Sequence, residues 1–266
     1  MSKLAVIIVN YNRGDLLKEC IDSLPSRWDL VVVDNASTDV ASRELAEGFK
    51  RGLWLQQSEN LGFGRACNLG ANHTTCDYLL FLNPDTYFLP ESQFCPETLF
   101  SEVPGASAFG FKHLDGNGDY QLSYGWYPRL STEVFRKILQ VCFDYPIKSV
   151  MELTHKFFNK RHEVSWVAGS SLLVKRESFW QIDGFDENIF LFFEDIDLCL
   201  RLGIEVGPVI YEPNIIIKHW RGASAKINRE VSKMHYRESQ IYFWEKYHGS
   251  FQAKLLKQLL IKLKRY

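Results

Sequence analysis

Short apolar runs that end in polar residues recur through the first third of the chain. Runs of this length beside turn residues predict buried strands of the kind found in parallel sheets. Between the runs, apolar residues at helical spacing predict helices, the first beginning at Asp15 and ending near Pro25. Strand and helix alternate at the pace of a doubly wound α/β fold, which favours a nucleotide-binding architecture. The strands are expected at residues 4–9, 30–33, 53–55 and 78–82.

The second half repeats this pattern less regularly. Residues 109–163 mix glycine, aromatic and charged residues, and the clearest expectation there is a helix over 132–142. A regular block follows, with an apolar run over 164–174, a helix that opens at Glu194 and two short strands at 209–211 and 215–217. No internal repeat or low-complexity linker interrupts the chain. We therefore interpret residues 1–248 as one domain, followed by a tail over 249–266.

The tail has its own pattern. Its apolar residues fall on one helical stripe, basic residues flank them, and no acidic residue follows Glu245. A basic amphipathic helix of this kind is typical of segments that bind an anionic membrane surface. The alternative is a terminal helix that packs on the domain and leaves its lysines solvated. The stripe comprises Phe251, Leu255, Leu256, Leu259, Leu260 and Leu263, and the basic residues are Lys254, Lys257, Lys262, Lys264 and Arg265.

Composition narrows the function classes. The 266 residues carry a formal net charge of −1, so the basic excess of a nucleic-acid-binding protein is absent and no nucleic-acid partner is expected. The six cysteines include no C-x-x-C pair, which favours reduced thiols in a cytosolic protein over disulfides. Neither a leader nor an apolar stretch approaching the roughly 20 residues of a spanning helix is expected. The sequence predicts a soluble or peripheral protein.

Carboxylates follow the predicted strands. Asp34 and Asp85 come directly or closely after apolar runs, and Glu194 and Asp195 form an adjacent acidic pair behind two phenylalanines. In open α/β sheets, ligands lie at the carboxyl ends of the strands. Carboxylates held there need a metal ion, a proton or a cationic ligand. These positions are therefore the candidate site.

Five motifs in order resemble the family 2 inverting glycosyltransferases with a GT-A fold, and among them the bacterial rhamnosyltransferases of O-antigen and cell-wall assembly. The resemblance covers roughly residues 4–225. It implies a Rossmann-like, mostly parallel sheet flanked by helices, with a nucleotide-binding half over 1–108 and an acceptor-binding half over 109–248. The motifs are Val-Asn-Tyr-Asn at 9–12, Val-Asp-Asn-Ala-Ser at 33–37, Asn-Leu-Gly-Phe-Gly-Arg-Ala-Cys-Asn at 60–68, Asn-Pro-Asp at 83–85 and Glu-Asp-Ile-Asp-Leu-Cys-Leu-Arg at 194–201.

The resemblance also implies the substrates. It favours dTDP-L-rhamnose as donor, with a UDP- or GDP-sugar as the alternative, and a hydroxyl of a lipid-linked saccharide as acceptor in surface polysaccharide synthesis. Such an acceptor implies a peripheral position at the cytoplasmic face of the cell membrane, which the basic tail suits. The donor sugar depends on a few side chains around the hexose, so the motifs leave it open.

The nucleotide-binding residues implied by the resemblance lie in the first half. Asn10 and Tyr11 would line the nucleotide pocket, and Asp34 would accept a hydrogen bond from the pyrimidine or the ribose. The alternative for Asp34 is a purely structural role in an Asx turn or a helix cap, although Asp39 could also fill that role. Asn60 and Arg65 belong to a loop in which Arg65 would contact the diphosphate or the base, unless the loop is only a structural turn.

The family's D-x-D motif is altered here. Asn83 stands in its first position, where it could contact the ribose or a metal-bound water, and Asp85 keeps the carboxylate that would hold Mg²⁺ or Mn²⁺ on the diphosphate. One negative charge is missing, so a lower metal affinity is expected. The motif is otherwise a common turn. His219 would assist at the metal, unless it is structural.

The acceptor side carries the predicted chemistry. By resemblance, Asp195 is the general base that deprotonates the acceptor hydroxyl, and Glu194 orients it, although the two roles could be exchanged. The alternative is that the pair only complements the dipole at a helix N-terminus. Gly169 and Trp166 would shape the acceptor site, with Trp166 as a sugar-stacking ring or, equally, a core residue.

Other classes remain as rivals. The missing carboxylate at Asn83 is what favours a non-catalytic sugar-nucleotide or scaffold subunit with the same fold. A nucleotidyltransferase would open with a basic glycine-rich loop after the first strand, where this chain has Asn-Tyr-Asn-Arg-Gly at 10–14. A dinucleotide-binding dehydrogenase is disfavoured because Cys67 stands where the third glycine of the fingerprint belongs.

Overall fold

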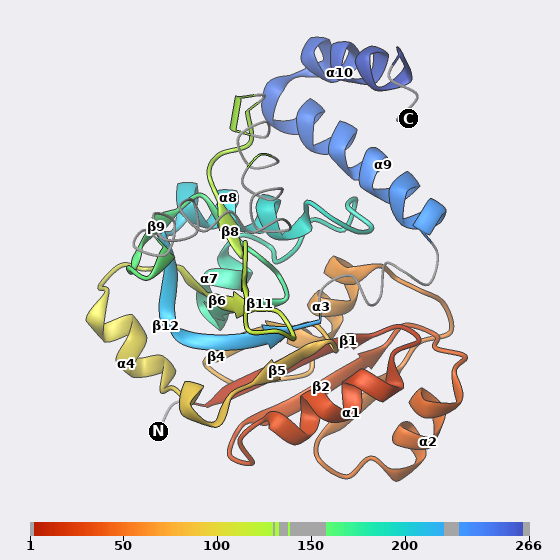
Figure 1. Ribbon diagram of the computed structural model, residues 1–266, viewed down its shortest axis with the longest axis vertical. Coiled ribbons are helices and arrows are strands. Elements are labelled where there is room, and N and C mark those ends of the chain that lie inside the picture. The colour runs from red at the N-terminus through yellow and green to blue at the C-terminus, as the bar shows by residue number, and fades with distance from the viewer. Residues whose placement is uncertain (1–2, 130, 133–137, 139–157, 221–228, 263–266) are drawn as a thin grey trace.

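The computed structural model describes residues 3–129, 131–132, 138, 158–220 and 229–262. Within these ranges the chain forms one large mixed sheet with helices on both faces (Figure 1). The helices are α1 (Gly14–Ser23), α2 (Val40–Gly48), α3 (Phe63–Asn72), α4 (Pro96–Glu102), α7 (Arg176–Gln181), α8 (Glu194–Glu205), α9 (Arg229–His248) and α10 (Ser250–Lys262), with a 3₁₀ turn at Pro90–Ser92. The strands are β1 (Leu4–Asn10), β2 (Asp29–Asp34), β3 (Leu53–Gln56), β4 (Tyr78–Leu82), β5 (Thr86–Phe88), β6 (Ala108–Leu114), β7 (Tyr120–Gln121), β8 (Tyr124–Gly125), β9 (His162–Val164), β10 (Trp166–Val167), β11 (Ser171–Lys175) and β12 (Val209–His219).

The predicted α/β alternation is confirmed in the first half. The strand order of the large sheet is β3-β2-β1-β4-β11-β6-β12-β5, and its first four strands pair in parallel. Beyond β4 the sheet is mixed, because β11 runs antiparallel to β4 and β6 while β12 is parallel to β6. The parallel strands bring the polar residues at their carboxyl ends to one edge of the sheet. That edge holds the first two predicted motifs.

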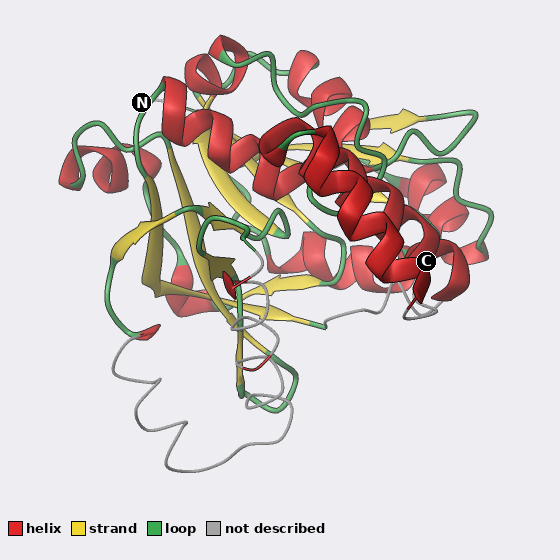
Figure 2. Cartoon of the chain, turned by 90° about the horizontal axis from the view of Figure 1, so that it is seen from above, coloured by secondary structure: helices red, strands yellow, loops and turns green. Residues whose placement is uncertain are grey.

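The two faces of the sheet bury separate apolar clusters. On one face, α1 and α4 cover alternate residues of β1 and β4, among them Val6 and Leu80. On the other, α3 and α8 cover the intervening residues, including Ile7 and Phe81. Strands buried on both faces read as continuous apolar runs, which is why β1, β2 and β4 were predicted from the sequence. Figure 2 shows the helices arranged around the strands.

Three details differ from the sequence prediction. Helix α1 begins at Gly14 rather than being capped by Asp15, because Asp39 accepts hydrogen bonds from the backbone N–H of both Gly14 and Ser42 and so serves the starts of α1 and α2. The strands expected at 209–211 and 215–217 form one strand, β12, with a register shift between Glu212 and Ile216. The helix expected over 132–142 lies largely outside the described residues.

The C-terminal region contains a helix that the sequence did not predict. Helix α9 precedes the tail helix α10, and the two pack together (Figures 1 and 2). Of the apolar stripe predicted for the tail, Leu260 is buried, as is the neighbouring Ala253, whereas Phe251, Leu255 and Leu259 are 80%, 58% and 45% exposed. The helix therefore packs in part against α9, and contact of its exposed side chains with a membrane stays a prediction.

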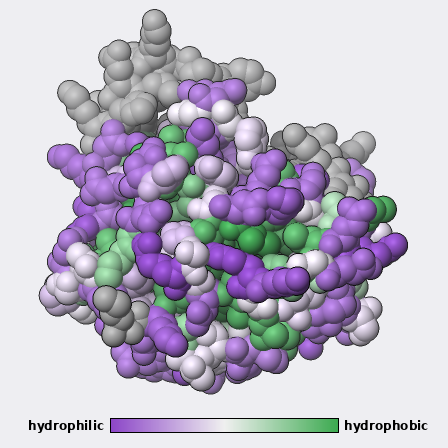
Figure 3. Space-filling model, turned by 90° about the horizontal axis from the view of Figure 1, so that it is seen from below, coloured by the Kyte–Doolittle hydropathy of each residue, from purple (hydrophilic) through white to green (hydrophobic). Residues whose placement is uncertain are grey.

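The surface seen from below is mainly polar, with apolar side chains gathered in a band between polar ones (Figure 3). Among the residues that the structure describes, none of the helices combines the length and apolar character that crossing a membrane requires. The described cysteines, Cys20, Cys67, Cys76, Cys95 and Cys199, are free thiols, and Cys142 lies outside the described residues.

Candidate active site

A row of polar side chains crosses the carboxyl ends of the first three parallel strands. The sheet register pairs Asn10 with Asp34 and Asp34 with Gln56. The Asn10 side-chain amide donates to Asp34 Oδ2 at 2.7 Å, and Gln56 Nε2 donates to Asp34 Oδ1 at 2.8 Å. Asp34 Oδ1 also accepts from the N–H of Ser37, three residues further on, so Asp34 stabilises the loop that follows β2. Asp34 is 1% exposed, so its carboxylate fixes this edge of the sheet.

Two loops meet beside this row. The Asn35 side chain donates to the Gly62 carbonyl at 3.0 Å, and Asn60 Oδ1 accepts from the Gly62 N–H. Gly62 has φ +82°, and a Cβ there would lie 2.3 Å from the Phe190 carbonyl oxygen, so this close approach requires glycine. The N–H of Phe63 donates to the same carbonyl. The glycine-containing loop thus joins the first half of the chain to the segment that precedes Asp195.

Two of the predicted nucleotide contacts lie at the surface. Tyr11 is 44% exposed and follows Asn10 at the end of β1. Arg65 lies on α3, where its Nε is 3.4 Å from Glu187 Oε2 in a pair whose side chains are each about half exposed. The contact of Arg65 with a diphosphate or a base stays a prediction.

Asp85 and His219 are distant in sequence but lie together where the edge strand β5 pairs with β12. β5 and β12 pair Thr86 with His219, which brings His219 Nε2 within 3.4 Å of Asp85 Oδ1. Asp85 is 3% exposed, and this oxygen has no hydrogen-bond partner among the described residues. His219 Nδ1 lies 3.2 Å from Gln121 Oε1, so a proton on Nδ1 would be donated to Gln121 and Nε2 would face Asp85.

This pair fits a divalent cation. A buried carboxylate oxygen without a donor and an imidazole nitrogen oriented by a hydrogen bond through its other nitrogen are typical of metal ligands. Besides this pair, the described ranges hold no cluster of three or more histidine, cysteine or acidic residues that could bind a metal. The remaining ligands of such an ion would come from water or a diphosphate.

The acidic pair occupies the N-terminus of α8, directly after two strained residues. Phe192 and Phe193 have φ values of +67° and +68°, a left-handed conformation that bulky residues rarely adopt. The turn directs Asp195 Oδ2 to the Gly169 N–H at 2.9 Å. Glu194 is 7% exposed, and its Oε2 has no hydrogen-bond partner among the described residues.

The two carboxyl groups are in different environments. Burial, followed by the charge of Asp195, raises the pKa of Glu194 well above its usual value. Asp195 is partly exposed. Burial therefore favours the neutral form of Glu194, beside a more exposed carboxyl group on Asp195.

A short bridge of backbone joins the acidic pair to the Asp85 region. The Asn83 N–H donates to the Ser170 carbonyl at 3.3 Å, and the adjacent Gly169 N–H donates to Asp195. β4 and β11 reinforce the bridge by pairing Leu82 with Ser171. Two of the five motifs, 83–85 and 194–201, are thus joined through residues 169–171.

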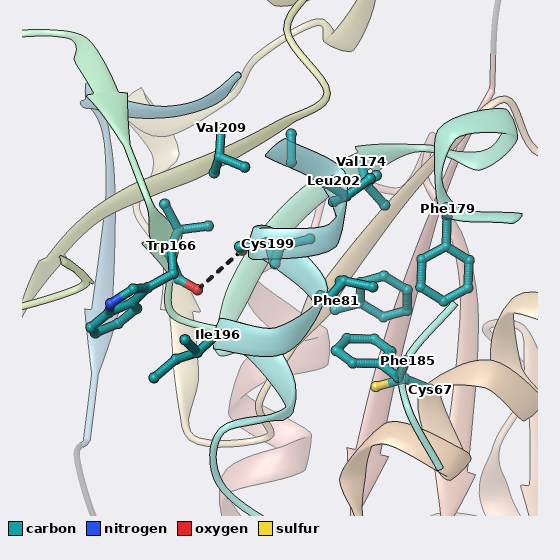
Figure 4. Close-up of a cluster of buried hydrophobic side chains, with 14 of the residues drawn as sticks. Cys67, Phe81, Trp166, Val174, Phe179, Phe185, Ile196, Cys199, Leu202 and Val209 are labelled. Atoms are coloured by element: carbon teal, nitrogen blue, oxygen red, sulfur yellow. Dashed lines mark hydrogen bonds between the residues drawn. The ribbon is translucent and has the colours of Figure 1, made fainter. Parts of the chain in front are cut away.

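Trp166 lies in the buried core. It is 8% exposed, its Nε1 donates to the Trp126 carbonyl, and it packs in the cluster that anchors α8 (Figure 4). The Cys199 thiol of α8 donates to the Val167 carbonyl at 3.8 Å. Of the two environments left open by the sequence, core and sugar platform, the structure has the first.

Sequence reasoning missed three polar residues of the site. Gln56 binds Asp34, Gln121 orients His219, and His113 Nε2 lies 2.6 Å from the Ser171 hydroxyl with its ring centroid 5.3 Å from that of His219. Gln121 and His113 fall in the segment whose pattern was least clear. A polar residue at the carboxyl end of β3 was the available signal for Gln56.

Known proteins are similar to this chain over most of its length. The profile described as "Glycosyl transferase family 2" matches residues 5–182. The chain is 26% identical over 270 residues to N-acetylglucosaminyl-diphospho-decaprenol L-rhamnosyltransferase of Mycobacterium tuberculosis, covering 95% of this chain and 87% of that protein. It is 25% identical over 231 residues to rhamnosyltransferase WbbL of Escherichia coli strain K12, covering 81% and 82%.

Solved structures support the fold. The crystal structure of GalNAc-T7 with UDP, GalNAc and Mn²⁺ superposes with a TM-score of 0.58 at 14% identity. The match covers 91% of this chain but 48% of that one, so this chain spans about half the length of that protein. At this identity the likeness concerns the architecture.

Proposed function

This chain belongs to glycosyl transferase family 2 and is a glycosyltransferase of GT-A fold; on that premise we propose that it transfers a sugar with inversion from a nucleotide donor to a hydroxyl of a lipid-linked saccharide. The observation that carries the proposal is the backbone bridge. It brings Asp195, through Gly169 and Ser170, next to Asn83 and hence to the Asp85–His219 pair.

In the proposed mechanism, the partly exposed carboxylate of Asp195 takes the proton from the acceptor hydroxyl as it attacks the anomeric carbon. The Gly169 N–H holds one carboxylate oxygen, which fixes the orientation of the base. Glu194 stays neutral in its buried position and keeps a second negative charge away from the attacking oxygen. Direct displacement from the face opposite the diphosphate gives the inverted product.

Asp85 and His219 are the residues that would hold Mg²⁺ or Mn²⁺, and Asn83 would contact the ribose. The ion, when bound, neutralises charge on the leaving diphosphate as a Lewis acid. Support comes from the unpartnered Asp85 oxygen and from the Mn²⁺ in the GalNAc-T7 structure. Asn10, Tyr11 and Asp34 would form the nucleotide end, with Asp34 acting mainly by holding the loop that carries the base-binding groups.

For the donor we favour dTDP-L-rhamnose, because the two curated relatives are rhamnosyltransferases. The name of the mycobacterial relative describes a diphospho-decaprenol substrate, which supports a polyprenyl-diphosphate-linked acceptor. An acceptor of that kind resides in a membrane, so the enzyme would act peripherally at its cytoplasmic face in surface polysaccharide synthesis. A UDP- or GDP-sugar donor is the alternative within the same fold.

Helix α10 supports the peripheral position. Its exposed Phe251, Leu255 and Leu259 lie near Lys254 and Lys257, a combination that suits an anionic bilayer surface. Flotation with vesicles that contain anionic lipid tests the contact. Leu255→Asp should release the protein from these vesicles, whereas Gln252→Asp, which adds the same charge without removing an apolar side chain, should not. Equal binding of all three proteins would contradict the proposal.

The first test of function is a transfer assay with the purified protein, a polyprenyl-diphosphate-linked acceptor, Mg²⁺ or Mn²⁺, and dTDP-, UDP- and GDP-sugars in parallel. Transfer from dTDP-L-rhamnose that Asp195→Asn abolishes supports the full proposal. Transfer from a different donor keeps the mechanism and discards rhamnose. Nucleotide binding without transfer from any donor would favour the non-catalytic subunit. Binding is followed by thermal shift, since a ligand at a hundredfold excess over its Kd stabilises by about 2.7 kcal/mol.

A further inference from the structure

One face of α9 packs against residues 186–197, the segment that carries Glu194 and Asp195. Seven residues of this face, spaced by one, three or four positions, meet residues 186–197. They are His235, Tyr236, Ser239, Tyr242, Phe243, Lys246 and Tyr247. Residues at this spacing form one stripe of an α-helix. The stripe therefore packs along the segment that runs from Asp186 into α8.

The N-terminal part of the stripe, residues 236–243, packs on the strained turn at Phe192–Phe193. Ser239 Oγ donates to the Leu191 carbonyl at 2.8 Å, and Ser239 is 4% exposed. The Tyr236 ring lies 5.6 Å from that of Phe192 and 5.3 Å from that of Phe193. Phe243 packs on Phe193 from the next turn of α9. Both phenylalanines with positive φ are therefore held by α9.

The C-terminal part of the stripe, Lys246 and Tyr247, contacts Asp186 and Asp197, which lie at the two ends of residues 186–197. Lys246 Nζ lies 2.6 Å from Asp186 Oδ2 and 2.6 Å from Asp197 Oδ1. Although burial opposes it, the hydrogen bond from Lys246 lowers the pKa of Asp186 to about 2. Tyr247 also donates to Asp197, which is fully buried, at 2.8 Å. Lys246, whose side chain is 30% exposed, thus links two carboxylates that lie eleven positions apart in this segment.

These contacts act where the backbone is least stable by itself. Two consecutive left-handed residues with side chains persist only when their surroundings hold them in place. The turn they form sets the direction of the following residues, and therefore the hydrogen bond of Asp195 to Gly169. Within the described residues, α9 supplies ring contacts to both phenylalanines and a hydrogen bond to the carbonyl just before them.

We infer that α9 is a positioning element of the active site, in which Tyr236 and Ser239 hold the Phe192–Phe193 turn so that Asp195 faces the acceptor. The inference rests on the proposed function, since it assigns to α9 a role in the step that Asp195 performs. It gives α9, the last helix before the tail, a role in positioning Asp195 that is independent of membrane contact.

The test is a double-mutant cycle on the full-length protein. Tyr236→Ala and Ser239→Ala are each expected to lower kcat by about tenfold or more, because small misplacements of a reacting group are costly, while the Kd for nucleotide stays unchanged. Met234→Ala, on the exposed side of the same helix, is the matched control and should leave kcat unchanged.

The decisive readout is non-additivity. If α9 acts through Asp195, then Tyr236→Ala in an Asp195→Asn background causes little further loss, because the positioned group is already absent. A merely structural role would lower the thermal midpoint and multiply the two losses. If the wild-type protein is active and the losses of activation free energy in the double variant are additive, the positioning role is overturned and the proposed function stands. The same holds if both single variants keep the wild-type kcat. Wild-type protein without transferase activity overturns the proposed function instead.

Discussion

Glu194 and Asp195 are adjacent in sequence, yet their environments predict very different losses of activity when each carboxyl group is replaced by an amide. Glu194→Gln replaces a carboxyl group that burial keeps neutral with an amide of similar size. Asp195→Asn replaces the partly exposed carboxylate and retains an oxygen that accepts from the Gly169 N–H. The fold should survive both changes, so that activity reports on charge alone.

The magnitudes follow from these protonation states. A positioned general base contributes about 10²–10⁴-fold to the rate, which corresponds to about 2.7–5.4 kcal/mol of transition-state stabilisation. Asp195→Asn should therefore lower kcat by that factor. Because burial raises the pKa of Glu194 and so favours its neutral form, Glu194→Gln should cost less than about 1.4 kcal/mol, a factor of ten.

Stability against pH provides an independent check. The pKa of Glu194 is raised from its usual value of 4.5 in the folded protein. Above pH 4.5 the folded state then binds more protons at this position than the unfolded state does, so the free energy of unfolding falls as pH rises toward the folded pKa. In Glu194→Gln this decline should be absent.

The assay combines kcat at neutral pH with denaturant unfolding across pH 4–8 for wild type and both variants. Equal loss of activity in the two variants would refute the assignment, because it would mean that Glu194 is charged and takes part in proton transfer. Full activity in Asp195→Asn would refute it from the other side. Unchanged pH dependence of stability in Glu194→Gln would contradict the neutral state of the buried carboxyl group.

Three further predictions concern single contacts. Gly169→Ala would place a Cβ 3.1 Å from that of Asp195 and should lower kcat by about tenfold. The control is Gly203→Ala, whose added Cβ meets nothing within 4 Å. It should raise the free energy of unfolding by about 0.5–1 kcal/mol without changing kcat. His219→Gln should abolish the metal-dependent part of the thermal shift caused by nucleotide, and an unchanged shift would exclude it as a ligand. Asp39→Ala should cost about 1 kcal/mol in urea unfolding, because α2 loses its N-cap, and a stability equal to wild type would contradict that role.

The sequence alone determined the regular half of the molecule and the residues at its strand ends. β1, β2 and β4 are buried on both faces, so their apolar runs were readable, and the polar residues that follow them, including Asn10 and Asp34, necessarily share one edge of a parallel sheet. Three of the five motifs that indicated the family lie at or just after the carboxyl ends of these strands. Local pattern is sufficient where strand direction and order follow a regular alternation.

What only the tertiary structure decided depends on contacts between distant segments. The pairing of Asp85 with His219 requires β12 to lie beside β5, and Gln121 joins them from a segment without a clear pattern. Trp166 carries the same indole whether it lies in the core or at the surface, and the packing of α8 decided that it is buried. Such outcomes depend on which elements become neighbours.

The C-terminal region illustrates the same limit. The periodicity of its last residues predicted one apolar stripe, but the helix buries Ala253 and Leu260 and exposes Phe251 and Leu255. The stripe of α9 was not recognised, because its tyrosines, serine and lysine are polar in composition and become complementary only against the turn at Phe192–Phe193. Periodicity shows which residues share a face of a helix, whereas the partner of that face is fixed by the fold.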